Sequence, residues 1–312
     1  MSGRYSVAIV GGTGRLGYEI SRVFLDEYRT TFPIVRVLTR DPSTARAQHL
    51  ASKGAMLQVL DQENVAQSLL ETFIHADVVI NALNVTARKA LKRQVAEAAV
   101  KGGAKVYFLS EFGVDHREND FPGYDHHDWD VKRELASHAR EVARGTPTQV
   151  IAVYTGLFIE LSLNVLGFDI DNNLFTCFGP STQKVSFTSK ADVGRALARL
   201  CTLALDPLTA PQVPDELRIS GNAVTYEDVR DLIAEVKGVQ KGEIKSEELE
   251  KLKHKLRDTP DSHVVEYIRV LMGEGKLDFS CDNANSLVNP AEAFWKWKSV
   301  ADQHRERRKV SQ

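Results

Sequence analysis

A glycine-rich turn between a buried strand and an amphipathic helix is the feature that most constrains the fold of this chain. The β-branched run Tyr5–Val10 predicts a buried strand, and Arg15–Tyr28 carries apolar side chains at helical spacing. Between them Gly11–Gly17 reads GGTGRLG, a G-x-x-G-x-x-G spacing. Glycines at such a junction allow a tight turn and let a pyrophosphate approach the helix N-terminus. We predict a dinucleotide site here; a turn needed only for helix–strand packing is the alternative. The predicted cofactor contacts of this turn are Gly11, Gly12, Thr13, Gly14, Arg15, Leu16 and Gly17.

The first half of the chain alternates apolar runs with amphipathic stretches. Further strands are predicted at Ile34–Leu38, Met56–Leu60, Asp77–Asn81, Lys105–Leu109 and Gln149–Val153. Helices are predicted at Thr44–Lys53, Val65–Phe73, Arg88–Lys101 and from about Asp128 to Arg144. This alternation gives right-handed crossovers and a parallel sheet covered on both faces. We therefore predict an α/β fold, a Rossmann-like doubly wound parallel sheet.

After Tyr154 the pattern becomes irregular. We predict an NAD(P)-binding domain over residues 1–155 and a smaller substrate-binding lobe over residues 156–312, interleaved with the last strands of the sheet. Within this C-terminal lobe, Arg218–Ser220 is expected to be a strand, and Tyr226–Lys237 and Glu243–Lys255 are expected to be helices.

Composition excludes several classes of protein. The 312 residues are 43% hydrophobic and 26% charged, as in a globular protein, and 40 basic against 42 acidic residues give no bulk attraction to nucleic acid. Neither a signal peptide nor a run of about 20 apolar residues is present, which argues against a membrane partner. Three widely spaced cysteines, Cys177, Cys201 and Cys281, argue against a disulfide framework and fit the cytoplasm. We expect a monomer or homodimer.

The end of the second predicted strand indicates which cofactor binds. An acid there would bond the ribose 2′-hydroxyl of NADH, whereas an arginine accommodates a 2′-phosphate. Arg40 occupies this position, with Arg46 at the start of the next helix, so NADPH is favoured; Asp41 is the one acid beside them. The exit of the fourth strand, at Asn81, Ala82 and Leu83, should border the cofactor mainly through its backbone.

Five segments in order carry a family resemblance. They are GGTGRLG, LTR at Leu38–Arg40, FLSEFGVD at Phe108–Asp115, DVKRELASHARE at Asp130–Glu141 and TSKADVGRAL at Thr188–Leu197. Over roughly residues 5–255 the chain resembles the NmrA-like branch of the atypical short-chain dehydrogenases. Within it the chain is most similar to the isoflavone reductase-like enzymes, which include pinoresinol-lariciresinol and phenylcoumaran benzylic ether reductases. Lys276–Pro290 looks more like fungal oxidoreductases of this group.

The resemblance implies NADPH-dependent reduction of an aromatic or related secondary metabolite. It places a catalytic lysine at Lys132, which is also expected to contact the cofactor, and implies that Ser110, Glu111, Phe112 and Gly113 run along the nicotinamide. Tyr154, Thr155 and Gly156, where the sixth strand ends, are expected to contact the cofactor as well. Leu109 stands where plant members have proline, and Thr155–Phe158 replaces their Ser-Asn-Cys-Phe, so a plant lignan or isoflavone should not be assumed as the substrate.

The residues around Lys132 indicate its chemistry. Asp128 lies four residues before it and Tyr124 eight, so the Y-x-x-x-K pair of the short-chain dehydrogenases is absent. A lysine that loses hydration beside an apolar nicotinamide site can donate a proton as hydride reaches carbon. The structural alternative is an ion pair with Asp128 one helical turn earlier. A non-catalytic NAD(P) sensor that regulates a partner protein, and an isomerase or dehydratase, remain alternative functions.

Two further sets of residues are candidates near the substrate. His126, His127 and Asp128, with His116 and Asp120 nearby, have the side chains of a metal site, but adjacent histidines do not share a helical face, so no metal is predicted. Phe112, His126 and Phe158 are candidates to contact substrate; both phenylalanines could equally be core.

Overall fold

The computed structural model describes residues 4–120 and 125–310, which form two compact units. The first unit contains the described residues up to Glu111, together with Val131–Val153 and Val193–Leu217. The second contains those of Phe112–Asp130, Tyr154–Asp192 and the chain from Arg218 onward. The chain thus passes between the units on both sides of residue 155, and the division at that residue stays a prediction.

A seven-stranded sheet in the order β11-β6-β5-β4-β1-β2-β3 forms the centre of the first unit. Its strands are β1 (Ser6–Val10), β2 (Ile34–Thr39), β3 (Met56–Val59), β4 (Val78–Asn81), β5 (Val106–Phe108), β6 (Gln149–Tyr154) and β11 (Glu216–Arg218). The neighbours from β3 to β6 pair in parallel. All residues of β1 and β4 are buried, which explains why these strands read as continuous apolar runs.

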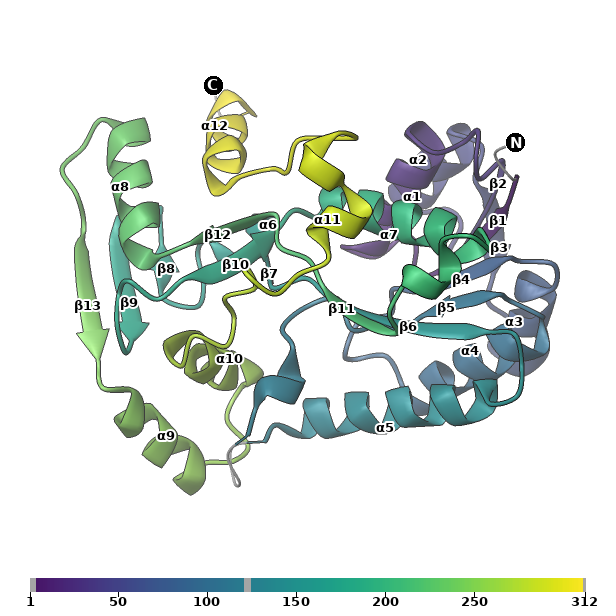
Figure 1. The fold of residues 1–312 in the computed structure, drawn as a ribbon, viewed down its shortest axis with the longest axis horizontal. Helices are drawn as coiled ribbons and strands as arrows, with labels where there is room; N and C mark the ends of the chain where they lie inside the picture. Colours follow the sequence, from purple (N-terminus) through teal and green to yellow (C-terminus); the bar gives the residue numbers. More distant parts are fainter. Residues whose placement is uncertain (1–3, 121–124, 311–312) are drawn as a thin grey trace. The chain divides into compact units, whose positions relative to one another are not determined.

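Helices cover both faces of this sheet, as predicted (Figure 1). On one face lie α1 (Gly17–Asp26), α2 (Ala45–Ser52) and α7 (Lys190–Leu205); on the other lie α3 (Val65–Phe73), α4 (Lys89–Lys101) and α5 (His127–Ala143). Glu27 beyond α1 pairs with Arg195 of α7 at 2.7 Å, and Glu134 of α5 pairs with Arg93 of α4 at 3.1 Å. The structure confirms the α/β, doubly wound, Rossmann-like fold.

Two small sheets organise the second unit. One has the order β12-β10-β7, from β7 (Leu157–Phe158), β10 (Val185–Thr188) and β12 (Asn222–Val224). The other has the order β13-β9-β8, from β8 (Phe168–Asp169), β9 (Leu174–Phe178) and β13 (Glu243–Glu247). The helices are α6 (Ile159–Ser162), α8 (Tyr226–Lys237), α9 (Leu249–Asp258), α10 (Val264–Gly273), α11 (Asn285–Val288) and α12 (Val300–Val310), with short 3₁₀ turns η1 (His116–Glu118) and η3 (Pro290–Glu292). A third 3₁₀ turn, η2 (Ala210–Gln212), belongs to the first unit.

The prediction of one helix over Glu243–Lys255 was wrong. Its first five residues form β13, which pairs in parallel with β9, and the helix α9 begins only at Leu249. Local sequence has helix-forming residues here, but pairing with a strand some seventy residues earlier decides the outcome. The late strand also lies earlier than expected, at Glu216–Arg218 rather than Arg218–Ser220.

Two expectations from composition can be compared with the structure. None of the helices in the described part of the chain has the length and apolar character needed to cross a bilayer. Cys177, Cys201 and Cys281 are all free thiols, the first two of them buried.

Candidate cofactor and active site

Three glycines of the turn between β1 and α1 are required by packing. Gly11 has a φ of +73°, and a Cβ there would lie 2.9 Å from the Ala82 carbonyl oxygen. A Cβ on Gly17 would lie 2.2 Å from the Gly11 oxygen, and one on Gly12 would lie 2.8 Å from Val37 Cγ1. Close packing therefore leaves no room for a side chain at these three glycines.

Gly14 differs from the other three. Of the described residues outside its immediate neighbours, only the Gly11 carbonyl oxygen, at 3.0 Å, lies within 4 Å of a Cβ placed on Gly14. The following helix has Leu16 at its N-cap, and a leucine side chain cannot accept a hydrogen bond from the first-turn N–H groups. Open space beside a glycine, at a helix N-terminus that has no side-chain cap, suits a bound pyrophosphate. The turn fits a dinucleotide.

Two arginines follow β2: Arg40 comes directly after the strand, and Arg46 lies in the first turn of α2. Arg46 Nη1 donates to the Thr13 carbonyl oxygen at 3.4 Å, which brings α2 to the glycine turn. Arg40 is exposed, and among the described residues it takes part in no ion pair. Ser43 donates to Asp41 from its backbone N–H and its hydroxyl at 2.8 and 2.6 Å, and these bonds lower the pKa of Asp41. The nearby acid is thus already occupied by Ser43.

The exits of β4 and β5 are tied together. Asn81 is buried; its side chain donates to the Tyr107 hydroxyl at 3.0 Å and accepts from the Leu83 N–H at 3.2 Å. Burial raises the pKa of Tyr107, which keeps this hydroxyl protonated. Ser110 Oγ donates to the Leu83 carbonyl at 2.6 Å, and Ala82 N–H donates to the Val10 carbonyl at 2.9 Å. The side chains of Asn81 and Ser110 therefore shape this edge by hydrogen bonds within the protein.

Lys132 forms an ion pair across this edge. Its Nζ lies 3.0 Å from Glu111 Oε2, with 24% of the lysine side chain and 4% of the glutamate side chain exposed. The lysine comes from α5 and the glutamate from the turn after β5. The alternative prediction, an ion pair between Lys132 and Asp128, is not what the structure shows. The Asp128 carboxylate instead lies 3.5 Å from both His126 and His127. Tyr124 lies outside the described residues.

In the second unit, the segments that contain Phe112, Thr155 and Gly156 meet. The N–H groups of Thr155 and Gly156 both donate to the Gly113 carbonyl, at 2.8 and 3.0 Å. Gly156 has a φ of +65°, and a Cβ there would lie 2.3 Å from the Ser186 carbonyl of β10. Phe112 and Phe158 are half-buried.

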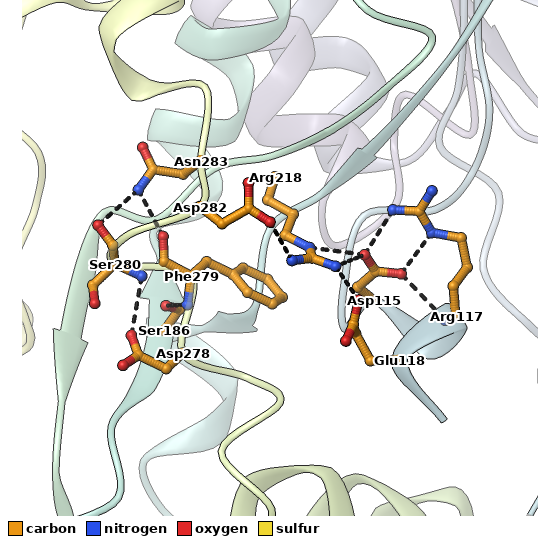
Figure 2. A network of polar contacts seen from close by, with 10 residues as sticks. All are labelled: Asp115, Arg117, Glu118, Ser186, Arg218, Asp278, Phe279, Ser280, Asp282 and Asn283. Atoms are coloured by element: carbon orange, nitrogen blue, oxygen red, sulfur yellow. Dashed lines mark hydrogen bonds and ion pairs between the residues drawn. The ribbon is translucent and has the colours of Figure 1, made fainter. Parts of the chain in front are cut away.

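A buried carboxylate network follows the same segment, and sequence reasoning missed it (Figure 2). Asp115 is fully buried and accepts from Arg117 Nε and Nη2 at 2.8 and 2.7 Å and from Arg218 Nε at 2.8 Å. Arg218 also bonds Asp282 at 2.6 Å and pairs with Glu118. Burial by itself would raise the pKa of Asp115, but the two arginines outweigh it and the net direction is downward. Asp115 belongs to the FLSEFGVD segment, but its partner Arg218 is too distant in the chain for any local signal.

Tyr154 and His126 are packed against other side chains of the second unit. The Arg117 guanidinium lies 4.5 Å above the ring of the buried Tyr154. His126 is buried against Tyr267, with ring centroids 5.1 Å apart, and burial followed by the neighbouring His127 lowers its pKa. His126, His127 and Asp128 offer ligand atoms within 4.8 Å of one another, but His126 Nδ1 already accepts the Asp128 N–H at 3.2 Å. The His126 side chain thus accepts a hydrogen bond from the first turn of α5.

Two known proteins are similar in sequence to part of this chain. The oxidoreductase aprR of Aspergillus flavus is 28% identical over 193 residues, which are 61% of this chain and 62% of that protein. The probable pinoresinol-lariciresinol reductase 3 of Arabidopsis thaliana is 29% identical over 194 residues, 60% of each chain. This chain therefore spans about three fifths of the length of these relatives.

Solved structures share the fold over nearly the whole chain. An isoflavone reductase superimposes with a TM-score of 0.76 at 19% identity, over 97% of this chain and 99% of that one. AtPrR2 with NADP⁺ and (+)-pinoresinol gives 0.72 at 19% identity, over 97% and 98%. NmrA, a negative transcriptional regulator, gives 0.70 at 16% identity, over 99% and 97%. The sequence model of the NmrA-like family matches residues 4–288, so this chain belongs to the NmrA-like family.

Proposed function

We propose that this protein is an NADPH-dependent reductase of an aromatic or related secondary metabolite, with Lys132 as the proton donor. The observation that carries the proposal is the Lys132–Glu111 pair at the exit of β5. It lies in the same unit as the glycine turn that fits a dinucleotide. An amine beside the exit of a central strand suits proton transfer to a ligand bound beyond the carboxyl ends of the sheet.

The residues proposed to hold NADPH fall into three groups. Gly14 and the first turn of α1 would receive the pyrophosphate, and Thr13, Arg15 and Leu16 complete this turn. Arg40 and Arg46 would bond the 2′-phosphate. The backbones of Asn81, Ala82 and Leu83, with Ser110, Glu111, Phe112, Tyr154, Thr155 and Gly156, are proposed along the rest of the cofactor.

NADPH supplies the hydride when it is bound. Lys132 donates a proton from Nζ to the substrate oxygen, or to a leaving group, and becomes a neutral amine that solvent reprotonates. The reduced bond thus gains one hydride and one proton. A charge-bearing lysine can perform this step without the tyrosine that Y-x-x-x-K enzymes use.

The substrate class is supported by the relatives. One relative is named a pinoresinol-lariciresinol reductase, and one structural neighbour holds (+)-pinoresinol. Phe112 and Phe158, both half-buried, are proposed to contact an aromatic ring, and His126 stays a weaker proposal because it already packs on Tyr267. We further propose a cytoplasmic monomer or homodimer.

The experiment follows NADPH consumption and product formation with a panel of aromatic ketones, enones and benzylic ethers. Turnover of one class with matched loss of NADPH supports the proposal. NADPH binding without turnover of any panel member contradicts it and favours the sensor function, which the fold shared with the regulator NmrA permits. Conversion of a panel member without net NADPH loss favours an isomerase or dehydratase.

A further inference from the structure

The pair between Glu111 and Lys132 differs from the surface ion pairs of the same helix. Glu111 exposes 4% of its side chain. Glu134, two residues after Lys132 on α5, exposes 46% of its side chain and pairs with Lys89 and Arg93. A carboxylate with so little access to water interacts more strongly with a cation at 3.0 Å than an exposed one does. The attraction between Glu111 and Lys132 is therefore only weakly screened.

The turn that carries Glu111 is fixed on both sides. Leu109 N–H donates to the Ile151 carbonyl at 2.9 Å, and Ser110 Oγ donates to the Leu83 carbonyl at 2.6 Å. The Glu111 N–H closes the turn on the Leu109 carbonyl at 2.9 Å. The backbone before the carboxylate is thus held by both neighbouring strand exits, and the lysine comes from a long helix, so neither end of the pair depends on a loose loop.

We propose that Glu111 is a positioning residue for Lys132: its carboxylate fixes the position and direction of Nζ at the exit of β5. The inference rests on the proposed function in assigning proton transfer to Lys132. Glu111 is the charged group that the structure records facing Lys132 from the turn after β5. The ionisable residue one turn earlier on α5, Asp128, lies beside His126 and His127.

The test measures the charge state of Lys132 without any substrate. The full-length protein is labelled with trace acetic anhydride over a range of pH, and acetylation of Lys132 and Lys89 is quantified by mass spectrometry. In Glu111→Gln, which keeps the size and an acceptor but removes the charge, the dependence of Lys132 acetylation on pH should change, because Nζ loses the carboxylate that it contacts. The matched control Glu134→Gln should leave the Lys132 profile unchanged.

An unchanged Lys132 profile in Glu111→Gln would overturn the inference. If that variant does not fold, Glu111→Asp is used, which retracts the charge by one methylene and should also change the Lys132 profile. An unchanged Lys132 profile in Glu111→Asp would also overturn the inference. In turnover assays with saturating NADPH, the alkaline limb of the pH–rate profile of Glu111→Gln should lie at lower pH than that of the native protein. A changed labelling profile without any turnover supports the positioning role of Glu111 and counts against the reductase proposal alone.

Discussion

Replacing Arg40 by alanine should remove the preference for NADPH over NADH while leaving the fold intact. Arg40 is exposed, and no ion pair involves it among the described residues, so its loss should leave the fold intact. A charge-assisted hydrogen bond contributes about 1.5–3 kcal/mol. Because the guanidinium is exposed to water, we use the lower end of this energy range. A factor of ten in affinity corresponds to about 1.4 kcal/mol, so the affinity for NADPH should fall about tenfold.

The assay is titration of the native protein and Arg40→Ala with both cofactors by calorimetry or fluorescence. NADH affinity should not change, and the NADPH preference of the native protein should shrink at high salt, because an exposed contact is screened. Arg144→Ala, at an arginine whose side chain is 76% exposed after the end of α5, is the matched control. Equal native affinities for the two cofactors, or parallel losses for both in Arg40→Ala, would refute the assignment.

Two further predictions concern the glycine turn and the buried carboxylate. Gly14→Val should stay folded by circular dichroism yet show no NADPH binding, whereas Gly17→Ala should lower the melting temperature because its Cβ meets the Gly11 oxygen at 2.2 Å; NADPH binding by Gly14→Val would contradict this. Asp115→Asn should destabilise the protein by about 3 kcal/mol, the lower end for breaking a buried pair, because both arginines stay partly exposed. Since the pKa of Asp115 is lowered in the folded state, its stabilisation is present above the unfolded pKa and is lost as pH falls through the folded one; melting curves that converge for native and variant protein at low pH check this.

Features that depend on neighbours in sequence could be predicted. The predicted helices Val65–Phe73 and Tyr226–Lys237 coincide with α3 and α8. The capping box of Thr225 and Asp228 at one end of α8, and Gly238 in the left-handed region at the other, explain why local sequence fixes that helix. The glycine turn is local only in part: Gly14 and Gly17 lie against the Gly11 carbonyl, whereas Gly11 and Gly12 lie against the distant residues Ala82 and Val37.

Features that depend on distant residues could not be predicted. The partner of Lys132 is 21 residues away and reaches it only because β5 and α5 end and begin at the same edge of the sheet. Asp115 and Arg218 are separated by 103 residues. The spacing within one helix predicted Asp128 as the partner of Lys132, because it takes no account of other elements. β13 was missed for the same reason, since it forms by pairing with the distant strand β9.

The most direct measurement of the central claim is transfer of deuterium from C4-deuterated NADPH to product, compared between native protein, Lys132→Ala and Lys132→Arg. We expect the label in the native product, nearly unchanged NADPH affinity in Lys132→Ala, and turnover reduced about 10²–10⁴-fold, the range for general acid catalysis. Lys132→Arg should not restore the rate, because a guanidinium does not readily release a proton. Near-native turnover in Lys132→Ala, or product formed without the label, would contradict the account.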